Sequence, residues 1–115
     1  MKVTNMISPK TGCKVANQYI IKDKDNHKIW FQSYDTMIAC VEYMGRAGEV
    51  TLIKGACNIS TTTSKYLYLF LEGYTLIEPA YNNKKGIKKL IEMGSIKEVE
   101  NFWKWYGRRN LALFI

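Results

Sequence analysis

The spacing of the apolar side chains changes near residue 60, and that change sets the fold class of this chain. Between residues 15 and 54, short runs rich in β-branched and aromatic residues alternate with turn-forming clusters, which is typical of β-strands. From Ser60 onward the apolar residues recur every three to four positions, which is typical of helices that bury one face. The sequence therefore predicts an α+β fold, with a β-rich first part and a helical second part.

Four strands are predicted in the first part. The polar cluster at residues 23–27 and the glycine-containing segment at residues 45–48 each separate two strand-like runs, so each pair is expected to form a hairpin. The simplest assembly is a four-stranded antiparallel meander over residues 15–54, although residues 36–44 also fit a short helix. The predicted strands are residues 15–22, 28–33, 38–43 and 49–53.

Three helices are predicted in the second part, at residues 61–72, 84–93 and 96–106. The run Ser60-Thr61-Thr62-Thr63 offers N-cap hydroxyls to the first helix, Gly73 is expected to end it, and Gly94 is placed to cap the end of the second. Ser95 and Glu98 match the capping box S-x-x-E, which predicts the start of the third.

The two ends of the chain are less regular. Ser8-Pro9-Lys10-Thr11-Gly12 is a turn signature, so residues 5–14 are expected to form an irregular segment. Leu111 to Ile115 is apolar throughout, and it is interpreted as a final strand, a docked tail or an oligomer contact.

A chain of 115 residues is long enough for one hydrophobic core and too short for two. We therefore expect a single domain over residues 1–115, with a β-rich part at 5–72 and a basic helical part at 73–115. The apolar run at residues 66–71 is far shorter than the ~18 residues of a membrane span. The first residues lack the apolar region of a secretory signal, so a cytoplasmic location in the cell that makes the protein is expected.

Residues for catalysis are sparse. The only histidine, His27, lies in an acidic predicted turn, so a serine or cysteine nucleophile has no evident base. Cys13, Cys40 and Cys57 are widely spaced and lack a C-x-x-C pattern, so we interpret them as reduced and structural. No phosphate-binding glycine motif occurs, and the carboxylates are dispersed. The sequence predicts a protein that is not an enzyme and needs no cofactor or metal.

The charge of the chain favours a polyanionic partner. It carries 17 Lys and Arg against 10 Asp and Glu, a net charge of +7. Lys84, Lys85, Lys88 and Lys89 recur on the side of the predicted second helix opposite Ile87, which would form a cationic face for phosphate contacts. An ordinary solvated face is the alternative interpretation.

The predicted third helix adds aromatic and cationic residues. Trp105 falls on a different face from Trp103, so it is expected either to stack on a base or anchor a protein, or to be buried against the apolar tail. Amide side chains such as Gln18 in the strands are expected to satisfy nearby backbone or turn groups, with ligand contact as the alternative. The predicted binding residues are Lys84, Lys85, Lys88, Lys89, Lys104, Trp105, Arg108 and Arg109.

Several short motifs between residues 5 and 72 are familiar as a set. They are Ser8-Pro9-x-Thr11-Gly12-x-x-Val15-Ala16-Asn17-Gln18-x-Ile20, Phe31-Gln32-Ser33-Tyr34 with Ile38-Ala39, and Ser60-x-Thr62-Thr63-x-Lys65-Tyr66-Leu67 with Phe70-Leu71. This set resembles a family of small uncharacterised proteins of bacteriophages and mobile elements. The chain departs from the pattern at Cys13, Cys57 and Ile59, where a polar residue, a Trp and a Tyr are expected. The resemblance implies no catalytic residues.

Small phage proteins without enzymatic motifs often oppose host defence, and anti-CRISPR proteins are the best-known example. The resemblance therefore leads us to expect an inhibitor that binds a CRISPR-Cas effector or its guide RNA, as a monomer or homodimer. Because the chain is basic, it would need guide RNA or an acidic protein patch as its target. The alternatives are a phage DNA- or RNA-binding accessory protein, and a structural phage protein that assembles through residues 111–115.

Overall fold

The computed structural model describes residues 1–44 and 47–102, with only the backbone given for Met44 and Ala47. One sheet contains six strands in the order β1-β2-β3-β4-β5-β6. The strands are β1 (Lys2–Ile7), β2 (Lys14–Asp23), β3 (Lys28–Ser33), β4 (Thr36–Met44), β5 (Ala47–Ile53) and β6 (Ile96–Val99). The helices are α1 (Thr61–Tyr74) and α2 (Lys84–Glu92), with 3-10 turns η1 (Ala56–Asn58) and η2 (Pro79–Tyr81).

The antiparallel meander is confirmed and is one strand longer than predicted. Strands β2 to β5 pair in sequence order, so the alternative helix at residues 36–44 is wrong. The predicted turn is present, because the Ser8 N–H donates to the Cys13 carbonyl at 2.9 Å. The segment before this turn is β1, which pairs with β2 instead of being irregular. Of its side chains only Met6 is buried, which left little apolar pattern in the sequence.

Both predicted helices in the middle of the chain are confirmed. The Ser60 hydroxyl caps α1 by accepting the Thr63 N–H at 3.0 Å. This helix continues through Gly73 and ends at Tyr74, two residues later than expected. At the end of α2, Gly94 has φ +81°, and the N–H groups of Gly94 and Ser95 donate to Ile91 and Leu90 in a Schellman motif.

The predicted helix at residues 96–106 is wrong over its first turn. Residues 96–99 form β6, which lies parallel to β5 and pairs Ile96 with Val50. Parallel neighbours need a long crossover connection, and α1 and α2 supply it here. Burial of Ile96 in the core together with this backbone pairing outweighs the local preference of the Ser95 capping box. The rest of the predicted helix lies outside the described residues, except for Glu100, Asn101 and Phe102.

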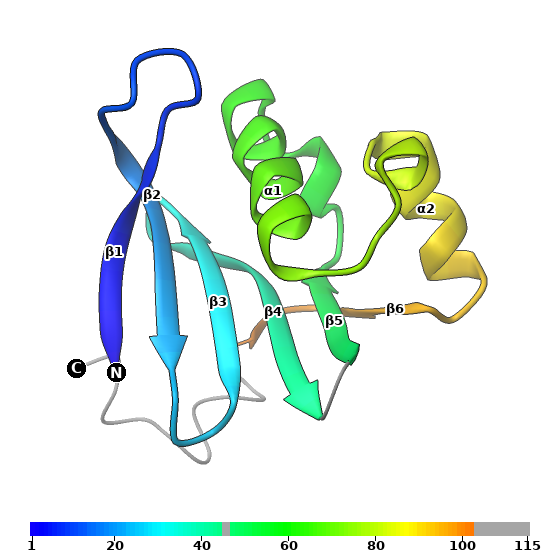
Figure 1. Cartoon of the computed structure of the whole chain (residues 1–115). Coiled ribbons are helices and arrows are strands. Elements are labelled where there is room, and N and C mark those ends of the chain that lie inside the picture. Colours follow the sequence, from blue (N-terminus) through cyan, green and yellow to red (C-terminus); the bar gives the residue numbers. More distant parts are fainter. Residues whose placement is uncertain (45–46, 103–115) are drawn as a thin grey trace.

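The main core lies between the sheet and the two helices, which cover the same sheet face in Figure 1. Phe31 of β3 stacks on Phe70 of α1 with ring centroids 5.7 Å apart. Buried aliphatic residues, including Leu67 of α1 and Ile87 of α2, complete this layer. Burying such side chains stabilises a fold by about 1.5–3 kcal/mol each.

A smaller apolar cluster lies on the opposite face of the sheet. It contains Ile21, Trp30, Cys40 and Phe102, all of them buried. The Trp30 and Phe102 rings meet edge to face at 5.0 Å with an interplanar angle of 86°. The segment that follows β6 therefore passes onto this second face.

Candidate anion-binding surface

The lysines predicted on the second helix form an exposed cationic face of α2. Lys84, Lys85, Lys88 and Lys89 are all exposed, whereas Ile87 on the other side of the helix is 1% exposed. Figure 1 shows α2 beside α1, on the side away from β1 and β2. We call these four residues the α2 lysine face.

Carboxylates do not neutralise this face within residues 1–44 and 47–102. The ion pairs there join other lysines to acids: Lys28 to Glu42 at 3.6 Å, Lys54 to Glu100 at 3.9 Å, and Lys97 to Glu49. The only acidic residue of α2 is Glu92, at its last position. The α2 lysine face is therefore a local excess of positive charge.

The other predicted binding residues have no structural test. Lys104, Trp105, Arg108 and Arg109 lie outside the described residues, as does the apolar segment at 111–115. The structure therefore brings together the four lysines of α2, and the contribution of the later residues stays a prediction.

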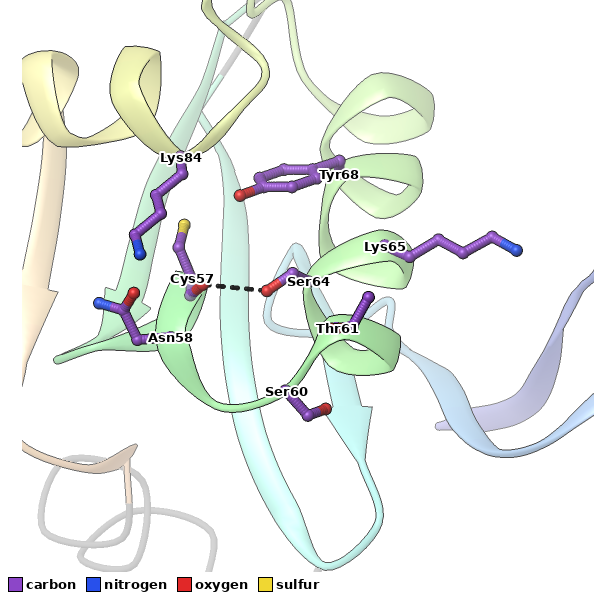
Figure 2. A pocket seen from close by; sticks show the side chains of 8 residues that line it. All are labelled: Cys57, Asn58, Ser60, Thr61, Ser64, Lys65, Tyr68 and Lys84. Carbon is purple, nitrogen blue, oxygen red and sulfur yellow. Dashed lines mark hydrogen bonds between the residues drawn. The ribbon is translucent and has the colours of Figure 1, made fainter.

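An open hollow lies next to the α2 lysine face, between η1, the first turns of α1 and the start of α2. Its volume is about 580 Å³. In Figure 2 the Lys84 side chain extends toward Cys57 and Asn58, while the Lys65 ammonium points away from the hollow. The residues that line it are Cys57, Asn58, Ser60, Thr61, Ser64, Lys65, Tyr68 and Lys84.

Sequence reasoning did not identify this hollow. Seven of its eight lining residues come from the continuous stretch 57–68, and the fold brings Lys84 to them. In the sequence, Ser60 and its neighbours indicated a helix cap alone. The Ser60 hydroxyl does cap α1, as that pattern indicated.

Two groups in the hollow are held in their neutral forms. Burial raises the pKa of the Cys57 thiol, while the neighbouring Tyr68 hydroxyl and the charge of Lys84 act in the opposite direction. Burial and the neighbouring Cys57 raise the pKa of Tyr68. Neither group therefore adds negative charge near neutral pH.

The only histidine, His27, lines a hollow together with Asp23 and Lys28, and no cysteine or serine is among the residues that line it. His27 is exposed in the turn between β2 and β3, and burial raises the pKa of the Cys40 thiol to about 12. Within residues 1–44 and 47–102, no three His, Cys, Asp or Glu side chains form a group that could hold a metal ion. In the same part of the chain, no helix is long and apolar enough to cross a membrane. The absence of enzymatic activity stays a prediction.

The polar motif residues converge where β2, β3 and the start of α1 meet. The Tyr34 N–H donates to the Asn17 carbonyl at 2.7 Å, and both residues have positive φ. The Ser33 hydroxyl lies 2.9 Å from that of Thr63. Gln18 is fully buried, and its side chain has no hydrogen-bond partner among the described residues, contrary to the expectation that it satisfies backbone groups.

Residues 1–91 match the model of a family of unknown function (DUF8033). The chain belongs to this family. The match continues past Gly73, where the resemblance was expected to end, and so includes Lys84, Lys85, Lys88 and Lys89. Searches of curated proteins and of solved structures found no match. The family description gives no function, so the phage origin and the anti-CRISPR role stay predictions.

Proposed function

We propose that this protein binds nucleic acid through phosphate contacts made by the α2 lysine face. The observation that carries this proposal is the presence of four exposed ammonium groups on one side of a single helix, without an ion pair among the described residues. Lysine clusters of this kind bind nucleic acid because each ammonium group that pairs with a phosphate releases cations condensed on the nucleic acid.

The spacing of the lysines suits a phosphate backbone. Residues four apart on a helix are separated by about 6 Å along its axis. Successive phosphates of one duplex strand are about 3.4 Å apart along the duplex axis, so the face would meet two or three of them. Such contacts do not read base edges, and we therefore expect binding that tolerates many sequences.

Fluorescence anisotropy with labelled single-stranded and double-stranded oligonucleotides, repeated at several salt concentrations, tests the proposal. With two or three phosphate contacts, the logarithm of the binding constant should fall with the logarithm of salt at a slope of about −1.5 to −3. The double variant Lys88→Gln/Lys89→Gln should reduce the steepness of that slope by about 1.5 to 2.

The matched control is Lys10→Gln/Lys24→Gln, which removes the same charge from two exposed turns away from α2. This control should bind almost as tightly as the unchanged protein. Equal losses in the two double variants would show that only net charge matters. Absence of binding to free nucleic acid, followed by binding when a CRISPR effector is added, would favour the inhibitor hypothesis instead.

A further inference from the structure

The hollow beside α2 and the α2 lysine face share one residue, Lys84. From this continuity we propose that the hollow is a phosphate-binding site, which holds one phosphate group of the strand that crosses α2. This inference rests on the proposed function and deepens it, because it assigns one contact to a defined site formed by Lys84, Asn58 and Thr61.

The lining of the hollow selects for an anion. None of the eight lining residues carries a carboxylate, and the neutral Cys57 and Tyr68 add no negative charge. The volume of about 580 Å³ lies within the ~300–1,000 Å³ of small-ligand sites. A phosphate group with its attached sugar therefore has room to enter.

The hydrogen-bond donors of the hollow fall into two groups. The Ser60 hydroxyl donates to Thr63 Oγ1 at 3.0 Å, and the Ser64 hydroxyl donates to the Cys57 carbonyl at 3.0 Å, which is the dashed line in Figure 2. These two are already engaged.

Three donors remain for a ligand. The side chains of Asn58 and Thr61 form no hydrogen bond with other side chains or backbone in the described structure. The Lys84 ammonium extends toward Asn58 in Figure 2 and forms no ion pair with the described carboxylates. An amide, a hydroxyl and an ammonium group are suitable partners for phosphate oxygens.

Two matched pairs of variants of the full chain test the site. Thr61 lines the hollow and Thr62, the next residue of α1, is exposed outside it, so Thr61→Glu and Thr62→Glu add the same charge at almost the same place. An acid in the first turn is favourable for a helix, so both should fold, which circular dichroism can verify. Thr61→Glu should weaken oligonucleotide binding roughly fivefold more than Thr62→Glu.

The second pair removes charge from α2. Lys84 lines the hollow and Lys85 does not, although both are exposed at the start of the same helix. We expect Lys84→Gln to weaken binding more than Lys85→Gln. Equal effects within both pairs would overturn the phosphate site while leaving the α2 lysine face intact.

A titration with inorganic phosphate, followed by NMR of the ¹⁵N-labelled protein, separates this inference from the proposed function. The backbone amides of Asn58, Thr61 and Ser64 should shift together, and the Thr61→Glu variant should lose the response. If phosphate shifts these amide resonances but the protein does not bind oligonucleotides, the site is supported and the nucleic-acid function is overturned. Oligonucleotide binding with no phosphate response at these amides would overturn the site alone.

Discussion

The hydroxyl oxygens of Ser33 and Thr63 lie 2.9 Å apart in the buried interface between β3 and α1. Thr63 also receives a hydrogen bond from the Ser60 hydroxyl at 3.0 Å, so one buried side chain joins the helix cap to the sheet. Ser33, Ser60 and Thr63 all belong to the short motifs quoted in the sequence analysis. These motifs therefore contain the hydrogen bonds that join α1 to the sheet. The hollow depends on that docking.

Replacement of Thr63 by Val should destabilise the protein by about 1–3 kcal/mol. Val keeps the shape of Thr but leaves the Ser33 hydroxyl buried without its partner, and Ser33 is 3% exposed. The single variant Ser33→Ala should cost less, because Thr63 keeps its bond to Ser60. Urea unfolding of the two variants and the double variant measures the coupling, and simple additivity would show that the two hydroxyls act independently.

Two helical glycines should respond to alanine in opposite directions. A Cβ on Gly86 of α2 would lie 2.3 Å from the Tyr81 carbonyl oxygen, whereas a Cβ on Gly73 of α1 would meet nothing within 4 Å. Gly73→Ala should therefore stabilise the protein by about 0.5–1 kcal/mol, since alanine is the better helix former.

Gly86→Ala should destabilise by about 1–3 kcal/mol, because α2 must move away from η2. Thermal unfolding of both variants checks the pair. If α2 were loosely docked, the two glycines would behave alike, and the geometry of the hollow at Lys84 would then not be fixed by the fold.

Local sequence patterns correctly predicted α1 and α2, because the ends of these helices are set by nearby residues. The helix that starts after Ser60 and the helix that is followed by Gly94 are predicted by capping groups and apolar spacing close to each residue. Strand β6 could not be predicted in this way, because Ile96 is buried by pairing with Val50, a residue far away in the sequence. Tertiary pairing outweighs a capping box when both compete for the same backbone.

The candidate site was predictable in part for the same reason. The cationic face depends only on the spacing of Lys84, Lys85, Lys88 and Lys89 within one helix. The hollow requires Lys84 at the start of α2 to meet residues 57–68 of η1 and α1, and a single sequence carries no direct signal for that meeting.

The edge-to-face contact of Trp30 and Phe102 should hold the end of the described chain on the second face of the sheet. Phe102→Ala should cost about 3–5 kcal/mol, because both rings are buried. Phe102→Leu keeps most of the volume and should lose much less. Urea unfolding measures both, and an alanine variant as stable as the leucine variant would show that this segment adds little to the second cluster.

The three cysteines should differ widely in their reactivity toward iodoacetamide at pH 8. Cys13 is exposed, Cys57 is half-buried with a raised pKa, and Cys40 is 1% exposed with a pKa raised by burial to about 12. Since the thiolate is the reactive form, a pKa of about 12 leaves only about one Cys40 in ten thousand ionised at pH 8. Mass spectrometry of tryptic peptides should find Cys13 alkylated first, Cys57 later and Cys40 only after unfolding in urea.

The labelling rate of Cys57 also tests the hollow, because Cys57 lies in its wall. Prior occupation by inorganic phosphate should slow the labelling of Cys57 and leave that of Cys13 unchanged, and equal rates with and without phosphate would argue against a ligand beside Cys57.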